Sequence, residues 1–324
     1  MKKVLKSVDV MKFIMSLCVV TIHCYIVEKI PIKILNNFLT CIIFMAVPFF
    51  YGTSGYLLYK DFNFDEDGKF RMKLKKYILH IFSMYVIWFI IYNVEDIYMC
   101  VVYLSAREFF DIAKRFFLWG NGHLWYLWAI IIILPIMHIL VKKVKPLYIV
   151  YIGFFLTCFF RFYSHYGSVE IPNWWQKPFV YLWQGKFLNI FGLCYSFAYI
   201  SVGVYLALTD EWKKLSNKNL FGILLLFILL CCFIDNGAVS IFYQPIVFVL
   251  LVLCLRFEIE SDNWFIRKAR NYSTYIYLSH VYAIALSAYI FDMSVVVWIM
   301  SIVFSIVFSY IILKIKKLKL ITRL

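Results

Sequence analysis

The chain has 324 residues, of which 64% are hydrophobic and 21% aromatic, and it carries a formal net charge of +15. A soluble domain of this size could not bury so much apolar surface, and the apolar residues form many runs that approach or exceed membrane-spanning length. The composition therefore excludes a soluble protein and predicts an all-α, polytopic transmembrane helix bundle, because the strands of a membrane barrel would alternate in polarity.

Ten apolar segments are predicted to cross the bilayer within a single domain that covers residues 1–324. They are residues 8–27, 36–59, 77–94, 124–141, 147–163, 187–208, 219–234, 237–256, 273–291 and 294–313. With a cytoplasmic N-terminus, 24 of the 33 Lys and Arg residues fall in inner segments and 8 in outer segments. Cytoplasmic segments are enriched in Lys and Arg, so both termini are predicted to be cytoplasmic, and the positive charge requires no nucleic-acid partner.

The first apolar segment carries a polar stripe formed by Lys12, Ser16 and His23. Lys12 and His23 are eleven residues apart, so on a helix they lie within about 20° of each other and about 16 Å apart along the axis. Ionisable side chains inside a membrane segment are costly, and their default interpretation is functional. A neutral imidazole can take and return a proton near neutral pH, so His23 is the candidate catalytic residue. The alternative is that His23 hydrogen-bonds to a neighbouring helix.

Asp9 lies three residues before Lys12, a spacing that predicts an ion pair at the inner membrane surface. The second apolar segment ends in VPFFYGTSGYLLYK, residues 47–60, in which Ser54 and Gly55 belong to a cluster of small residues. Small residues permit close helix packing, and they can also line a binding site.

A basic segment follows, KFRMKLKKYILH, residues 69–80. Its cations would suit a polyanionic ligand such as a nucleotide diphosphate. The alternative is that they reflect only the cytoplasmic location or contacts with anionic lipids. These cations are Arg71, Lys73, Lys75 and Lys76.

Two later segments also begin with polar and aromatic residues. The fourth opens with NGHLWYLW, in which His123, Trp125 and Trp128 would suit a flat, hydroxyl-rich acceptor, although an aromatic belt would also explain the tryptophans. The ninth opens with NYSTYIYLSHVYA, which places His280 about 10 Å into the membrane from the inner side. The long outer loops, residues 95–123 and 164–186, are candidate functional loops.

Four of these elements, in this order, resemble acyltransferase family 3. Asp9 with Lys12-x10-His23 resembles the family's Asp-x-x-Arg and Arg-x10-His pattern, and VPFFYGTSGYLL resembles its apolar run ending in Ser-Gly-aromatic-Leu. HLWYLW resembles its HLW start of a later span, and YSTYIYLSH its Tyr-Leu-x-His segment. The resemblance extends from about residue 7 to the last span.

This resemblance implies a bacterial plasma-membrane enzyme that transfers an acyl group, typically acetyl, from cytoplasmic acyl-CoA to an extracytoplasmic glycan or lipid-linked sugar. His23 would be the essential residue, with Lys12 and Asp9 as the other catalytic residues. We expect acetyl-CoA to be the donor and no metal to be needed. The sequence does not indicate the oligomeric state. The expected cofactor-binding residues are Ser54, Gly55, Arg71, Lys73, Lys75 and Lys76, with Ser54 and Gly55 in a turn on the donor's access path. The expected acceptor-binding residues are His123, Trp125, Trp128 and His280.

Two positions depart from the family pattern. Lys12 replaces the usual Arg, which keeps the charge but loses the bidentate guanidinium. Ile130 stands where many members with a Trp-x-Leu-x-x-Glu box carry Glu. The HLWYLW segment is similar to the branch that contains the membrane domain of serine racemase-type resistance proteins, which has been linked to amino-acid uptake. Two alternatives are therefore an amino-acid or lipid-linked-sugar transporter or flippase, and a structural or sensory partner of a glycan export complex.

Overall fold

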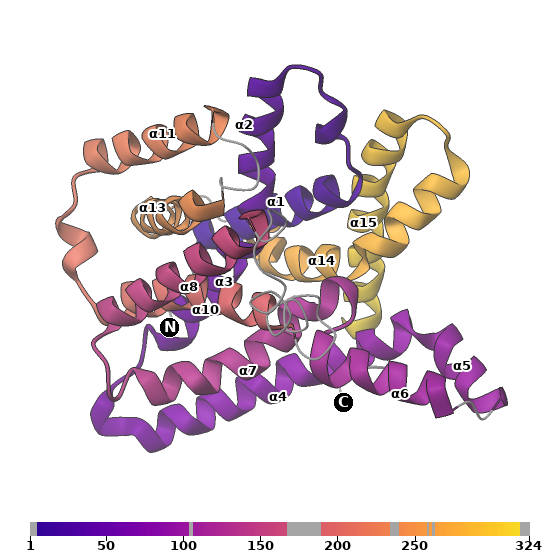
Figure 1. Ribbon diagram of the computed structural model, residues 1–324, viewed down its shortest axis with the longest axis horizontal. Coiled ribbons are helices and arrows are strands. Elements are labelled where there is room, and N and C mark those ends of the chain that lie inside the picture. Colours follow the sequence, from indigo (N-terminus) through magenta and orange to yellow (C-terminus); the bar gives the residue numbers. More distant parts are fainter. Residues whose placement is uncertain are drawn as a thin grey trace. The chain divides into compact units, whose positions relative to one another are not determined.

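The computed structural model describes residues 5–103, 106–166, 189–233, 240–257, 259–260 and 263–317, and within these ranges the regular structure is helical (Figure 1). The longer helices of the first half are α1 (Lys6–His23), α2 (Lys33–Phe44), α3 (Ala46–Tyr59), α4 (Asp67–Tyr92), α5 (Val94–Tyr103), α6 (Ala106–Lys114), α7 (Trp125–Leu140) and α8 (Pro146–Tyr166). Those of the second half are α10 (Ile190–Leu208), α11 (Asn217–Phe233), α13 (Tyr243–Arg256), α14 (Trp264–Ile290) and α15 (Ser294–Lys317).

Each of the ten predicted spans contains a helix, but several boundaries differ from the prediction. The second span consists of α2 and α3, which meet at Met45. Helix α14 begins at Trp264, well before the predicted start of the ninth span, so His280 lies about 24 Å along this helix. The outer segment 95–123, predicted as a loop, contains α5 and α6. Most of the second predicted outer loop, residues 164–186, lies outside the described residues, as do its three tryptophans.

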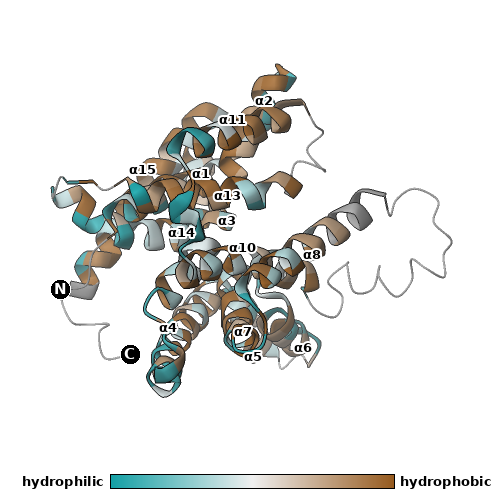
Figure 2. Cartoon of the chain, turned by 90° about the vertical axis from the view of Figure 1, so that its left-hand side faces the viewer, coloured by the Kyte–Doolittle hydropathy of each residue, from teal (hydrophilic) through white to brown (hydrophobic). Residues whose placement is uncertain are grey.

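Among the described residues, five helical stretches are long and apolar enough to cross a membrane. They are Lys33–Tyr59, Phe64–Tyr92, Ala106–Leu140, Ile190–Leu208 and Ser294–Ile315. Three shorter apolar helices are Pro146–Phe159, Asn217–Phe233 and Tyr243–Arg256. Hydrophobic residues dominate the helical ribbon, as the brown colour of Figure 2 shows. The composition of these helices indicates a membrane protein, whereas the count of ten spans and the cytoplasmic termini stay predictions.

The chain forms two compact units. The terminal unit comprises residues 1–53 and 210–324, and the central unit comprises residues 54–209. In the terminal unit, α14 packs against both α1 and α15, and α11 packs against α2 and α13. Val20 of α1 with Tyr272 and Ile276 of α14 form a buried apolar cluster there. The side chains that approach one another from α1 and α14 are therefore held by a packed helix pair.

In the central unit, α10 packs against α7 and α8, and α4 packs against α7 (Figure 1). Gly55 of α3 allows one close approach in this unit. A Cβ atom at position 55 would lie 2.5 Å from the backbone oxygen of Ile200 in α10. Ser54 and Gly55 lie within the continuous helix α3, so the predicted turn at these residues is wrong. The lack of a side chain at Gly55 therefore allows α3 and α10 to pack closely.

Replacing Gly55 with alanine is expected to destabilise the protein by about 1–3 kcal/mol, because the backbone of α10 would have to move. The matched control is Gly68→Ala in the first turn of α4, where a Cβ atom would meet nothing within 4 Å. That substitution should be neutral or stabilise by up to about 1 kcal/mol, since alanine favours helix over glycine. Thermal unfolding of the two variants in detergent micelles measures the difference, and equal melting temperatures would contradict the packing role.

Candidate active site

Asp9 and Arg270 form an ion pair between α1 and α14. The Arg270 Nε atom donates a hydrogen bond to Asp9 Oδ1 at 2.8 Å. Asp9 is buried, whereas 49% of the Arg270 side chain is exposed. Lys12 lies close enough to interact electrostatically with both residues. The hydrogen-bonded ion pair that the spacing predicted for Asp9 and Lys12 is therefore formed by Asp9 and Arg270, with Lys12 as a second nearby cation.

Two histidines meet further along the same two helices. The ring centres of His23 and His280 are 4.9 Å apart, and the ring planes are tilted by 33°. His23 is the exposed last residue of α1, whereas His280 is fully buried in α14. The Nδ1 atom of His280 lies 2.5 Å from the backbone oxygen of Tyr277. A carbonyl oxygen can only accept, so Nδ1 carries a proton and donates it, which makes Nε2 the acceptor of the neutral ring.

Helices α1 and α14 thus run parallel and share a polar track, which we define as Asp9, Lys12 and His23 of α1 with Arg270 and His280 of α14. On each helix the cation precedes the imidazole by about three turns, or about 15–16 Å. Lys12 and His23 face the same neighbouring helix, as their shared face on the first predicted span requires. Sequence reasoning missed Arg270. Its spacing of ten residues from His280, close to the eleven between Lys12 and His23, is the signal that could have found it.

The four cations predicted to bind a polyanion are separated on α4. Arg71 and Lys75 border a groove of about 260 Å³ between α4 and α7, whose other lining residues are Leu74, Ile78, Leu79 and Pro135. Lys73 instead donates to the backbone oxygen of Leu58 at 2.6 Å. Lys76 is exposed. Within the central unit, the structure brings Arg71 and Lys75 together and turns Lys73 toward the end of α3.

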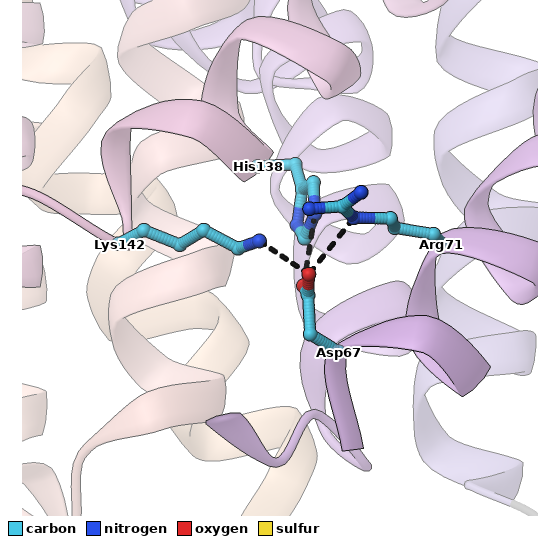
Figure 3. Close-up of polar contacts among 4 residues, drawn as sticks. All are labelled: Asp67, Arg71, His138 and Lys142. Carbon is cyan, nitrogen blue, oxygen red and sulfur yellow. Dashed lines mark hydrogen bonds and ion pairs between the residues drawn. The ribbon is translucent and has the colours of Figure 1, made fainter. Parts of the chain in front are cut away.

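Arg71 is held by a polar cluster that joins α4 to α7 (Figure 3). The carboxylate of Asp67 lies 2.8 Å from Arg71 Nε, 2.5 Å from Lys142 Nζ and 3.1 Å from His138 Nε2. Asp67 begins α4, whereas His138 lies in the last turn of α7 and Lys142 in the turn that follows it. His138 is buried, and this contact agrees with a structural role. The cluster therefore orients the Arg71 guanidinium at the edge of the groove.

Replacing Asp67 with asparagine is expected to lower the melting temperature, because Arg71, Lys142 and His138 lose their shared anionic partner. The matched control is Glu66→Gln, the neighbouring residue, which removes an exposed ion pair with Lys69 that spans 2.7 Å. Exposed pairs of this kind contribute little to stability. Thermal unfolding in detergent should therefore separate the two variants, and an equal effect would show that the cluster does not join the helices.

Ser54 contributes to a group of hydroxyls in the central unit. Its Oγ atom lies 3.3 Å from the hydroxyl oxygen of Tyr126 in α7. The side chain of Tyr77 in α4 also lies close enough to interact with Ser54. The two tyrosines were not predicted as site residues, and nothing in the sequence spacing distinguishes them from the other aromatic residues. The hydroxyl of Ser54 thus faces a polar contact between three helices.

His123 and the two neighbouring tryptophans have different surroundings. The ring of His123 makes an edge-on contact with Tyr92, with 4.5 Å between the ring centres. The ring centres of Trp125 and Tyr195 are 6.0 Å apart. Trp128 is buried, and its Nε1 donates to the backbone oxygen of Phe117 at 3.0 Å. Trp128 therefore supports the turn before α7, whereas His123 and Trp125 belong to aromatic contacts near the start of this helix.

Gly120 permits the turn that carries these aromatic residues. It has a φ of +76°, which favours glycine, and a Cβ atom there would lie 2.5 Å from the Cα atom of Trp125. Ile130, which replaces the family's Glu, is buried in α7. An apolar core side chain thus occupies the position at which many family members carry Glu.

The helices and the polar track together define a helical membrane protein with ionisable groups between its helices. The acyltransferase domain model of family 3 matches residues 5–314, nearly the whole chain. The chain therefore belongs to acyltransferase family 3 and is a membrane acyltransferase that transfers groups other than amino-acyl groups. Neither the comparison with curated proteins nor that with solved structures found a match.

Proposed function

We propose that this acyltransferase moves an acetyl group from cytoplasmic acetyl-CoA to a hydroxyl of an extracytoplasmic glycan or lipid-linked sugar. It would do so in a bacterial plasma membrane, with ten spans and both termini in the cytoplasm. The observation that carries the proposal is the polar track, in which His23 contacts His280 and Asp9 pairs with Arg270. Two membrane helices that pair ionisable side chains along a shared surface can provide catalytic groups as well as packing contacts.

His23 would be the general base of the transfer. It takes the proton of the acceptor hydroxyl while the oxygen attacks the thioester carbonyl, so that a C–O bond forms. The C–S bond then breaks, and CoA leaves as a thiolate that takes up a proton. His23 is suited to this role because it is an exposed residue at the end of α1. Lys12 is about 16 Å away along the helix, too far to stabilise the oxyanion, so we assign it with Asp9 to the donor end.

The donor's phosphates would be bound on the cationic start of α4. Arg71 and Lys75 support this assignment best, since both border one groove and Asp67 holds only the Nε side of the Arg71 guanidinium. The terminal guanidinium nitrogens of Arg71 can therefore bind a phosphate. Lys73, Lys76, Ser54 and Gly55 complete the proposed donor-binding set. At the acceptor side, the aromatic contacts of His123 and Trp125 favour binding of a sugar ring, and Trp128 supports them from the core.

Transfer of labelled acetyl groups tests this function. Membrane vesicles that contain the protein are incubated with acetyl-CoA labelled in the acetyl group, and envelope glycans and lipids are extracted. Label on a glycan or lipid-linked sugar, with the mass increment of one acetyl group, is the expected result. A lack of label in every fraction, combined with solute uptake that depends on His23, would replace the proposal with the transporter alternative. A silent His23→Ala variant, when loss of the whole protein is not silent, would indicate a partner of a glycan export complex.

A further inference from the structure

His280 is a buried titratable residue whose contacts point to a role other than acceptor binding. It has no exposed surface, and its ring lies against that of His23. Its neighbours in α14, Tyr277 and Ser279, are also buried. The ring of Tyr277 in turn contacts His280 and Phe50, with 5.9 Å and 6.2 Å between ring centres. A side chain enclosed in this way is poorly placed to contact a sugar, but it is well placed to act on the exposed imidazole beside it.

We infer that His280 is a positioning residue for His23. In the inferred arrangement, Nε2 of His280 accepts a hydrogen bond from a ring N–H of His23. The protonated Nδ1 of His280 donates to the backbone oxygen of Tyr277 at 2.5 Å, which selects the tautomer with the lone pair on Nε2. Ring centres 4.9 Å apart allow a ring nitrogen of His23 to reach hydrogen-bond distance of His280 Nε2 when the exposed ring of His23 turns.

This hydrogen bond would act on His23 in two ways. It fixes the ring orientation and leaves the other nitrogen of His23 with its lone pair directed away from His280, toward the acceptor. When that nitrogen takes the proton of the acceptor hydroxyl, the resulting imidazolium keeps its N–H bond to Nε2 of His280, so the positive charge faces a lone pair. No proton leaves the pair during attack, and the proton later passes from His23 to the departing thiolate. The third group of a catalytic triad orients its base by the same principle.

Two substitutions at position 280 separate this role from simple packing, although the catalytic part rests on the proposed function. His280→Leu fills the buried space with an apolar side chain but provides no acceptor. His280→Gln provides an amide that can donate to the Tyr277 carbonyl and accept from His23. We expect His280→Leu to lower kcat for acetyl transfer by about 10-fold or more with an almost unchanged KM for acetyl-CoA, and His280→Gln to retain more activity. If the leucine variant is as active as the glutamine variant, or more active, His280 serves packing alone and the inference is overturned.

A second measurement does not depend on acyl transfer. Diethyl pyrocarbonate modifies histidine rings through the unprotonated nitrogen, and peptide mass spectrometry at one fixed neutral pH gives the rate for each histidine. We expect His280→Leu to slow modification of His23 several-fold and His280→Gln to slow it less, with the exposed His80 of α4 as internal reference. Rates at His23 within twofold of wild type in both variants would overturn the inference. Dependence of the His23 rate on residue 280, in a protein that transfers no acetyl group, would keep the pair and reject the proposed function.

Discussion

Replacing His23 with alanine is expected to lower acetyl transfer to envelope acceptors by about 100-fold or more. General acid–base catalysis by a positioned side chain contributes factors of this size, and alanine removes both ring nitrogens. The melting temperature should change little, because His23 is exposed at the end of α1. The measurement is the initial rate of label transfer from acetyl-CoA in vesicles with matched amounts of protein.

His80 provides the matched control for this substitution. It is an exposed histidine of α4 and belongs to no proposed site. His80→Ala should therefore transfer acetyl groups at the wild-type rate. A similar loss of activity in both variants would indicate general damage, and wild-type activity in His23→Ala would exclude this residue as the base.

Replacing Arg270 with methionine is expected to destabilise the protein by about 3 kcal/mol. The substitution leaves the carboxylate of Asp9 buried without its hydrogen-bonded cation, and a buried charge that loses its partner is costly. The expected cost is at the lower end of the range for such pairs because Lys12 stays near the carboxylate. Asp9→Asn should cost less, since the cation that loses its hydrogen-bonded partner is the half-exposed side chain of Arg270. Denaturant unfolding in detergent micelles compares the two variants.

Two further variants sharpen this comparison. The double variant Asp9→Asn with Arg270→Met should be more stable than Arg270→Met alone, because it also removes the carboxylate that Arg270→Met leaves buried without its hydrogen-bonded cation. Lys268→Met is the control on the same helix, since Lys268 is exposed and stacks on Trp264 with its Nζ atom 4.5 Å from the ring centre. It should cost about 1 kcal/mol or less. Equal stability of Arg270→Met and Lys268→Met would show that the Asp9 pair does not stabilise the helix contact.

The helical class and the approximate positions of the helices could be predicted because apolar runs of membrane-spanning length are a local property of the chain. Helix boundaries were predicted less well. Helix α14 starts at Trp264 and includes Arg267, Lys268 and Arg270 before its apolar part begins. The length of an apolar run measures the part of a helix that suits lipid, and charged residues can extend the same helix beyond it. Helices α5 and α6, with 10 and 9 residues, were predicted as a loop because neither is long enough to form an apolar run of membrane-spanning length.

The sequence by itself determined that Lys12 and His23 share one face, since the pitch of a helix relates residues eleven apart without any knowledge of their neighbours. Only the tertiary structure decided what that face meets. The partner of Asp9 is Arg270, which is 261 residues away, and the partner of His23 is His280. Such pairs depend on which helices pack together and in which register. Side-chain spacing sets the face of a helix, whereas packing across the whole chain selects its partners.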